Sequence, residues 1–567
     1  MRWILSQTNP EIVFRLEKAL EIPQRFAHLL VLRGINDPET AARFLHPEMR
    51  HLHDPFLMAG MAEAVERLLG AARRKEPILI YGDYDVDGTM GIVVLRESLE
   101  RVGASPDFYI PKRLVEGYGM RSEVVEEAGR RGVKLIISVD TGIRAAPIVA
   151  RAHELGIDCI VTDHHLPEER LPPARAVLNP NRPDCLYPDK NLCAVGVVFK
   201  LVQALFERAR LEGREKLLHS FLKLVALGTI ADVVPLVGEN RIFAKVGLEG
   251  LRWPANPGLK ALLGVAGVDL NKLTSYDVSF RIGPRINAAG RMADASKVIE
   301  LFTTKVPERA GEIAEELNRL NAERQQAEER ILEEILDRVA GNPSLAEEHV
   351  LVFAGENWHR GVVGIVASRI VERFHRPALV FSVEGDPLRR AHGSGRSLPA
   401  FDLLACLDSA ADLFERYGGH RLAAGCSLEE AKLPELRQRL NGFARVRIRP
   451  ADLEPTLSID EEIQLSEITT EWLEAISLLQ PFGNGNPAPR FVARGLRVTS
   501  AARLLKEKHA AIQVSDGERE MEAVGWNMAS RLVTLERGCS LDLAFEVEKT
   551  DFGRLGPFRL IIRDLHC

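Results

Sequence analysis

The sequence has few cysteines and no long apolar run, and both shortages narrow the class of protein. Its seven cysteines are odd in number, scattered, and never arranged as Cys-x-x-Cys, which argues against a disulfide framework or a zinc ribbon. No segment approaches the roughly 20 apolar residues that a membrane-spanning helix requires, and the first residues lack the apolar core of a signal peptide. We therefore expect a cytoplasmic protein with reduced thiols and no membrane partner.

Two common phosphate-binding signatures are also missing. No Gly-x-x-x-x-Gly-Lys-[Ser/Thr] segment occurs, and no Gly-x-Gly-x-x-Gly follows a predicted strand, so nucleotide-triphosphate and dinucleotide sites lack support. The comparable run is the glycine-rich loop Gly393 to Ser397, whose backbone N–H groups and Arg396 guanidinium can hold one phosphate. A plain turn is the alternative for this loop. The formal net charge of −6 gives no overall attraction to a polyanion, so any such contact must be local.

The length and the order of patterns predict several domains. A chain of 567 residues should divide into roughly three to four domains. Amphipathic helices over 11–20 and 25–32 form a lead-in, and from residue 77 to about 251 apolar strands alternate with helical stretches such as 90–101, 122–130 and 145–155. That alternation is typical of a doubly wound parallel sheet.

The second half of the chain shows three further patterns. A long helix over 306–339, apolar on one stripe and charged elsewhere, is interpreted as a bridge between domains, with a coiled coil as the alternative. A smaller α/β region follows, with strands at 350–353 and 378–381 and a helix over 362–374. Evenly spaced short strands after residue 451 then predict a small β-barrel of the OB type.

Four short polar segments each follow an apolar run, and together they point to one site. They are Asp83-Tyr84-Asp85-Val86-Asp87-Gly88 after 77–80, Asp140 after 135–139, Asp163-His164-His165 after 159–162, and Asp232 after 227–231. Because ligands of open α/β sheets gather at the carboxyl ends of strands, we expect these strand or helix ends to meet in one crevice. So many carboxylates would repel one another and raise their pKa values unless a positive group lay among them. We interpret that group as a pair of divalent metal ions.

The residue types in these segments favour particular ions and a particular chemistry. Carboxylates with one imidazole suit Mn²⁺, tolerate Mg²⁺, and lack the thiolates or three histidines typical of zinc. Asp85 and Asp87 on an extended loop would point the same way, with Gly88 allowing the chain to turn. His164 and His165 would face opposite ways, so we expect at most one to bind a metal. Two ions about 3.5–4 Å apart form the standard arrangement for phosphoester hydrolysis. A helix N-cap is the alternative role for a single aspartate at such a position.

These segments together resemble the DHH phosphoesterase superfamily, named for its Asp-His-His motif, and within it the RecJ family of single-strand-specific DNA exonucleases. The resemblance extends over nearly the whole chain and is carried further by Ser279 to Arg291, Trp358 to Ala367, Gly393 to Ser397, Gly418-Gly419-His420 and Pro481 to Pro487. It implies 5′ to 3′ hydrolysis of single-stranded DNA to mononucleotides in recombination and repair, with two Mn²⁺ or Mg²⁺ ions. The implied partners are single-stranded DNA, a single-strand-binding protein and a RecQ-type helicase, and we expect a monomer.

Taken with the patterns, the resemblance gives an α/β fold: a doubly wound parallel-sheet DHH catalytic domain, a long bridging helix, a smaller α/β DHHA1 domain and a C-terminal OB-type β-barrel. The expected boundaries are 1–50 for the helical lead-in, 51–305 for the DHH domain, 306–340 for the bridging helix, 341–448 for the substrate-binding DHHA1 domain and 449–567 for the nucleic-acid-binding OB domain.

The resemblance also implies roles for individual residues. Its catalytic set is Asp83, Asp85, Asp87, Asp140, His164, His165 and Asp232, and all of these except His165 are implied metal ligands; Asp163 completes the third motif. The residues implied to contact substrate are Arg281, Asn287, Arg291, Arg360, Ser394, Arg396 and His420. From the residues alone, the arginines around Arg285 suit bidentate phosphate recognition, and a solvated loop is the alternative. In the barrel, Phe482, Phe491, Trp526 and Phe558 are candidates for stacking on bases, with burial in the core as the alternative.

Two other functions remain open at this point. One is a phosphodiesterase for short oligonucleotides or cyclic dinucleotides, against which the extra binding platform of the barrel argues. The other is a DNA-binding scaffold that has lost catalysis, against which the intact acidic and histidine-bearing segments argue.

Overall fold

The computed structural model describes residues 1–117, 119–385, 389–550 and 555–567. These residues form two compact units: one comprises 1–53, 233–246 and 456–567, and the other comprises 54–232 and 247–455. None of the described helices combines the length and the hydropathy needed to cross a bilayer. All seven cysteines are free thiols, as the sequence predicts.

The 54–232 part of the second unit is built on a parallel sheet, which confirms the doubly wound prediction. Its strand order is β3-β2-β4-β5-β6, and every neighbouring pair is parallel. Side chains alternate along each strand, so Ile78 and Ile80 face one layer of helices while Leu79 and Tyr81 face the other. The strands are β2 (Ile78–Gly82), β3 (Pro106–Tyr109), β4 (Leu135–Val139), β5 (Asp158–Thr162) and β6 (Ala176–Leu178).

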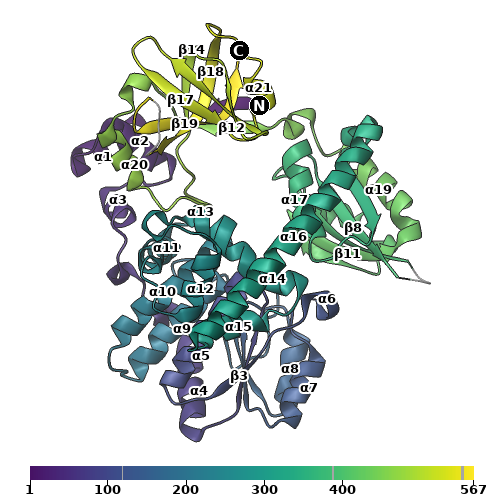
Figure 1. The fold of residues 1–567 in the computed structure, drawn as a ribbon. Helices are drawn as coiled ribbons and strands as arrows, with labels where there is room; N and C mark the ends of the chain where they lie inside the picture. The colour runs from purple at the N-terminus through teal and green to yellow at the C-terminus, as the bar shows by residue number, and fades with distance from the viewer. Residues whose placement is uncertain (118, 386–388, 551–554) are drawn as a thin grey trace. The chain divides into compact units, whose positions relative to one another are not determined.

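Helices cover both faces of this sheet (Figure 1). On one face lie α4 (Met61–Arg74), α5 (Val86–Arg101) and α9 (Ala194–Arg208), and on the other lie α7 (Ser122–Arg130) and α8 (Ala146–Glu154). The long apolar helix α10 (Arg214–Ala231) packs against α5 and α9, so its last residues approach the start of α5. The carboxyl ends of the strands and the end of α10 therefore converge on one region.

A group of mostly short helices follows α10 along the chain. They are α11 (Gly238–Leu251), α12 (Pro257–Val265), α13 (Ser275–Asp277), a π-helical turn η4 (Val278–Ile282), α14 (Gly283–Met292) and α15 (Ser296–Thr303); the four-residue α6 (Arg113–Glu116) lies earlier, after β3. The segment 278–292 is therefore helical and not the solvated loop that was the alternative for its arginines.

The predicted long helix is present as α16 (Pro307–Gly341). It packs against α12, α14 and α15, and it also packs against α17 (Val363–Phe374) of the region that follows. Its buried stripe includes Ile313, Leu317, Ile331 and Ile335, which confirms the predicted apolar face.

The region after α16 is a second α/β layer. Its mixed sheet has the order β10-β11-β9-β8-β7, flanked by α17, α18 (Leu403–Asp408) and α19 (Leu433–Arg445). The strands are β7 (Leu351–Glu356), β8 (Ala378–Glu384), β9 (Arg390–Arg396), β10 (Arg416–His420) and β11 (Ala423–Glu429).

The glycine-rich loop that we predicted at 393–397 is mainly a strand, β9, so that prediction was wrong. Its backbone pairs with β8 and β11 on both sides, which removes its N–H groups from any phosphate nest. Glycine is needed here for close packing, because a Cβ on Gly393 would lie 2.2 Å from the Phe381 ring.

The first unit contains the predicted β-barrel. Its strands run in the order β13-β14-β18-β19-β17-β16-β15, and an additional β14–β16 pairing closes the ring. The strands are β13 (Glu461–Glu462), β14 (Phe491–Val498), β15 (Arg503–Leu505), β16 (His509–Ser515), β17 (Glu520–Gly525), β18 (Ser540–Lys549) and β19 (Phe558–His566); the short helices are α20 (Thr470–Ser477) and α21 (Ala529–Leu532).

The N-terminal helices pack into the same hydrophobic core as the barrel. Helices α1 (Pro10–Leu20), α2 (Gln24–Leu32) and α3 (Pro38–Leu45) contribute Leu16, Leu30 and Phe44 to it. A strand that the sequence did not predict, β1 (Arg2–Leu5), pairs in parallel with β12 (Thr456–Ile459).

A buried guanidinium also ties parts of this unit together. Arg241 is only 1% exposed and lies over the Phe44 ring. Its nitrogens donate to the carbonyl oxygens of Phe44, Leu478, Leu479 and Gln480 at 2.6–3.0 Å. Residues remote in sequence are thereby joined through one side chain.

Candidate metal centre

Three strand ends and one helix end bring together the residues that the sequence singled out. Asp83 follows β2, Asp140 follows β4 and Asp163-His164-His165 follows β5, as expected. Asp232 differs, because it caps the C-terminus of helix α10. The negative end of that helix therefore points at the same site as the carboxylates, which adds to the need for a positive partner.

The first motif is not the extended loop we predicted. Asp85 is the N-cap of α5, with its Oδ1 accepting a hydrogen bond from the Gly88 N–H at 3.0 Å, and Asp87 lies in the first turn of that helix. Gly88 is required for close approach and not for a turn, since a Cβ there would lie 2.7 Å from the Asp83 carbonyl oxygen. The N-cap alternative and the ligand role are compatible, because a capping carboxylate retains a second oxygen.

Asp87 is fixed by a second helix start. Its Oδ2 accepts from the Ala194 N–H at 2.6 Å and its Oδ1 from the Val195 N–H at 2.8 Å, both in the first turn of α9. These two bonds hold the buried carboxylate in one orientation.

The two histidines do not face opposite ways as we expected. Asp163 Oδ1 accepts from the backbone N–H groups of His164 and His165 at 2.8 and 3.0 Å, which bends the chain out of an extended conformation. The same oxygen lies 2.8 Å from His165 Nδ1, and Asp163 Oδ2 accepts from the Ile143 N–H at 3.0 Å. Both rings consequently lie beside Asp140, whose Oδ1 is 3.3 Å from His164 Nε2 and 3.8 Å from His165 Nδ1.

The remaining carboxylates surround His164. Its Nε2 lies 3.7 Å from Asp232 Oδ2 and 3.9 Å from Asp87 Oδ2. Asp140 itself adopts a left-handed backbone conformation with φ of 62°, which is uncommon outside glycine and typical of functional sites.

The electrostatics of this cluster favour a bound cation. Burial, and then the neighbouring Asp85, raise the pKa values of Asp83 and Asp140 well above their ordinary value and that of Asp87 to about 7. Burial and the charge of Asp87 likewise raise the pKa of Asp232. Burial and the neighbouring His165 lower the pKa of His164 to about 4, so its imidazole is neutral and able to coordinate a metal.

The donors present fit divalent metal ions. Three groups offer ligand atoms that lie within 4.8 Å of one another: Asp87-His164-Asp232, Asp83-Asp85-Asp140, and Asp140-His164-His165. In addition, Asp83 Oδ1 is buried with no hydrogen-bond partner among the described residues. A buried oxygen of this kind is costly unless a cation or water satisfies it. The carboxylate-rich set suits Mn²⁺ or Mg²⁺, as predicted.

Asp163 has a different role from the other aspartates. Burial acts to raise its pKa, but the hydrogen bonds it accepts and the charge of His165 outweigh that effect, so the pKa of Asp163 lies below its ordinary value. An ionised Asp163 fixes His165 with its Nδ1–H as the donor, which leaves Nε2 as the ring nitrogen that can take part in proton transfer.

Comparison with protein-family models supports this assignment. The DHH family N-terminal domain matches residues 77–229, the DHHA1 domain matches 347–445, and the RecJ OB domain matches 459–564. Curated relatives named single-stranded-DNA-specific exonuclease RecJ align over almost the whole chain. The Bacillus subtilis protein is 36% identical, and the aligned region covers 100% of this chain and 70% of that protein. The Escherichia coli protein is 34% identical, and the aligned region covers 96% of each chain.

The chain belongs to the RecJ family. Its structure agrees with this membership: the crystal structure of Thermus thermophilus RecJ in complex with Mn²⁺ matches with a TM-score of 0.85 and 30% identity, covering 100% of this chain and 79% of that one. The Mg²⁺ complex of the same protein matches with a TM-score of 0.78 and 29% identity, covering 100% and 78%. As a RecJ-family member the chain shares a metal-dependent nuclease fold, and its predicted α/β, DHHA1 and OB architecture is confirmed.

The predicted substrate residues of the helical segment 278–292 have different partners, and not all of these belong to the metal centre. Asn287 Oδ1 accepts from the Val86 N–H at 3.2 Å, so this side chain supports the first turn of α5 between Asp85 and Asp87. Arg291 donates to the Gly361 carbonyl oxygen at 3.1 Å. Arg281 is 47% exposed and is paired with Asp277, and none of its described contacts reaches the acidic cluster.

Sequence reasoning missed Arg113, which lies on α6 beside the centre. Its guanidinium is 5.0 Å from the centre of the Tyr84 ring, and its charge partly offsets the rise in the pKa of Asp83. Burial lowers the pKa of Arg291 to about 9 and that of Arg396 below its usual range, and in both cases the charge of Arg113 lowers it further. No short motif surrounds Arg113, so only its place in the fold reveals it.

The predicted DHHA1 residues fall into two groups. Arg396 donates to Ser394 Oγ at 3.0 Å, and both lie close to Gly364 at the start of α17. Burial, and then the charges of Arg144 and His165, lower the pKa of His420, so this side chain is within electrostatic range of His165 at the metal centre. Arg360 is instead paired with Glu384 at 3.8 Å.

The barrel aromatics are mostly core residues. Phe491 and Phe558 are buried and Phe482 packs against the core, whereas Trp526 is 45% exposed with its ring edge-on to His509. Trp526 is therefore the barrel aromatic among these four that is placed to stack on a base.

Proposed function

We propose that this chain degrades single-stranded DNA from its 5′ end to mononucleotides, in recombination and repair, with two Mn²⁺ or Mg²⁺ ions at the acidic cluster. The observation that carries the proposal is the complete set of carboxylates around the neutral His164, in a chain whose full-length relatives are named single-stranded-DNA-specific exonucleases. When bound, such ions supply an activated water and neutralise charge for in-line hydrolysis of a phosphodiester.

In this proposal Asp83, Asp85, Asp87, Asp140, His164 and Asp232 hold the ions. Asp87 is kept in place by the N–H groups of α9, and Asp232 supplies a carboxylate from the end of α10. Asp163 does not coordinate a metal, since its two oxygens are occupied by four hydrogen bonds. His165 acts on the substrate through Nε2, either holding a phosphate oxygen or moving a proton.

A cluster of three guanidiniums supports the binding of a phosphate. After burial, the charge of Arg113 lowers the pKa values of Arg291 and Arg396, so the three guanidiniums lie close together, and none of them forms an ion pair with a carboxylate among the described residues. Three mutually repelling cations beside a metal centre are stabilised by a bound anion. We assign them, with Ser394, to a substrate phosphate, and Asn287 to support of the first motif.

The other residues implied by the family are assigned on weaker contacts. Arg281 and Arg360 are proposed to hold the strand further from the reacting phosphodiester, because both are exposed and pair with carboxylates outside the acidic cluster. His420 is proposed to hold the strand nearer the centre, within range of the charge of His165. The barrel, through Trp526, is proposed as an additional platform for bases. A cytoplasmic monomer that works with a single-strand-binding protein and a RecQ-type helicase completes the proposal.

The experiment compares two labels on one strand. A single-stranded oligonucleotide labelled at its 5′ end should release labelled mononucleotide at once in Mn²⁺, whereas a 3′ label should pass through progressively shorter products. Asp140→Ala should abolish both reactions while retaining the fold. Cleavage of a dinucleotide alone would indicate the small-substrate phosphodiesterase, and binding without cleavage would indicate a scaffold; either result contradicts the proposal.

A further inference from the structure

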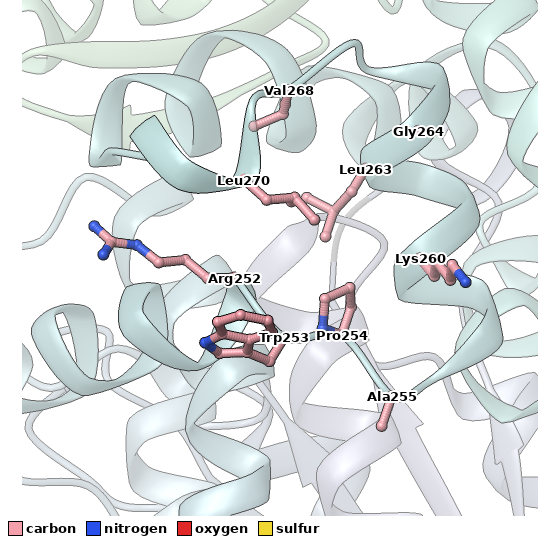
Figure 2. A pocket seen from close by; sticks show the side chains of 9 residues that line it. All are labelled: Arg252, Trp253, Pro254, Ala255, Lys260, Leu263, Gly264, Val268 and Leu270. Carbon is pink, nitrogen blue, oxygen red and sulfur yellow. The ribbon is translucent and has the colours of Figure 1, made fainter.

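A pocket away from the acidic cluster has the composition of a nucleic-acid-binding site. It has a volume of about 630 Å³ and lies between the turn that follows α11 and the end of α12. Figure 2 shows Trp253 and Pro254 on one side and Leu263 and Leu270 on the other, with Arg252 and Lys260 at its two flanks. Among the described residues, none of those lining the pocket is acidic.

Trp253 is unusual among the tryptophans of this chain. It is 79% exposed, whereas Trp358 is buried with its indole N–H donating to Glu334, and Trp472 packs in the barrel core. Its backbone is nonetheless held, because its N–H donates to the Gly250 carbonyl oxygen and its own carbonyl accepts from Lys223 Nζ. A large aromatic side chain is thus presented to solvent from a fixed turn.

The charges around Trp253 are also uncompensated. Neither Arg252 nor Lys260 forms an ion pair within the described part of the chain, and both side chains are exposed. One aromatic surface between two cations matches a single nucleotide step, in which one base lies between two phosphates. A base stacked on Trp253, with its two flanking phosphates paired with Arg252 and Lys260, would give each of the three side chains a partner.

Exposed aromatic and basic residues also lie beside this pocket, on the helical segment that leads toward the metal centre. Arg281 donates to the Gly267 carbonyl oxygen at 3.3 Å, directly before Val268 in the pocket wall. Beside Arg281, Tyr276 and Phe280 are 62% and 64% exposed, with ring centres 4.6 Å apart. Gly283, less than one turn further, packs on Ala231 next to Asp232, since a Cβ there would lie 3.4 Å from the Ala231 Cβ.

We infer that the Trp253 pocket is a second binding site for single-stranded DNA, which takes one base on Trp253 and its flanking phosphates on Arg252 and Lys260. The inference rests on the proposed function, because it assumes a single-stranded substrate longer than the catalytic cluster can hold. Its role is to retain a long strand, so it should affect affinity for long substrates and leave chemistry on short ones unchanged.

The test uses the full chain and an oligothymidylate of about 30 nucleotides. Its affinity is measured by fluorescence anisotropy in EDTA, and its KM in Mn²⁺. Trp253→Ala should weaken binding and raise KM roughly tenfold, the typical loss of one stacked base. Turnover of a dithymidine dinucleotide should not change. Arg252→Gln and Lys260→Gln should each reduce the slope of log affinity against log salt by about 0.7.

Leu186→Ala serves as the matched control, because Leu186 is an equally exposed apolar residue of the same unit, at 86% exposure. If the wild-type chain degrades the long strand but Trp253→Ala binds it as tightly as Leu186→Ala does, the pocket assignment is wrong while the proposed function stands. If Trp253→Ala loses affinity only for an acidic peptide, the pocket is a peptide site and the assignment is also wrong. If the wild-type chain neither binds nor degrades the strand, both proposals fail.

Discussion

The same substitution at two neighbouring aspartates should change stability in opposite directions. Asp163 and Asp83 are both buried, but Asp163 accepts four hydrogen bonds while Asp83 has an oxygen without a hydrogen-bond partner among the described residues. The pKa of Asp163 lies below its usual value and that of Asp83 well above it. Replacing each by asparagine therefore removes a stabilising charge in one case and a destabilising charge in the other.

The magnitudes follow from the contacts. In Asp163→Asn one oxygen can keep its three donors, but the new NH₂ group faces the Ile143 N–H, and a buried unsatisfied donor costs about 1–3 kcal/mol. With weaker neutral bonds in place of charge-assisted ones, the free energy of unfolding should fall by about 2–4 kcal/mol. Asp83→Asn relieves repulsion in the metal-free chain, so its free energy of unfolding should rise by about 1–2 kcal/mol, one pKa unit being about 1.4 kcal/mol.

Thermal unfolding in EDTA at alkaline pH measures both effects. Nuclease rates in Mn²⁺ should fall in both variants, by roughly 10–100-fold for Asp163→Asn because it orients His165. The pKa of His165, which Asp163 raises against the effect of burial, should drop in that variant and can be followed by NMR of the imidazole ring. If the two variants shift the unfolding temperature in the same direction, the distinction between a positioning aspartate and a repelled cluster member is incorrect.

Three further outcomes follow from the structure. In the folded chain the pKa of Asp87 is raised from 3.8 to about 7, so between these pH values the metal-free protein binds more protons when folded than when unfolded. Its stability should therefore fall as the pH rises through this window. Differential scanning calorimetry should show that this loss disappears in saturating Mn²⁺. Gly393→Ala should destabilise the 347–445 region by roughly 1–3 kcal/mol in urea unfolding, because the added Cβ would collide with Phe381. Gly418→Ala is the control, because a Cβ at that position meets open space. Arg241→Met should lower the free energy of unfolding by about 3 kcal/mol or more, because several buried carbonyl oxygens lose their donor, and unchanged thermal unfolding would show that these bonds contribute little.

The sequence allowed the main elements of the fold to be predicted because their signals are local. Residues 77–80, 135–139 and 159–162 are short apolar runs followed by polar turns, and they are strands β2, β4 and β5. The α16 helix carries an uninterrupted 3.6-residue period, and its predicted and observed ranges agree closely.

The errors have long-range causes. Strand β9 is rich in glycine and was predicted to be a loop, because the Phe381 ring that requires those glycines lies on another strand. The short β1 has no pattern of its own and forms only by pairing with β12, far away in sequence.

The site was predictable in its members and not in its geometry. The motifs identified Asp83, Asp140 and Asp232 by chemical type, but the local conformations depend on hydrogen bonds that no periodicity encodes. The rings of His164 and His165 approach the same carboxylate because Asp163 bends the chain, and Asp85 caps a helix while remaining in the cluster. Arg113 was missed for the same reason: its position depends on the tertiary fold and not on a motif.

The central claim is that the carboxylates around His164 bind two divalent cations. The most direct measurement is an anomalous difference map from crystals grown with Mn²⁺, collected for the wild-type chain and for Asp140→Ala. We predict two peaks in the wild-type chain, bounded by Asp83, Asp85, Asp87, Asp140, His164 and Asp232, with at least one lost in the variant. A map without any peak beside these residues would contradict the account.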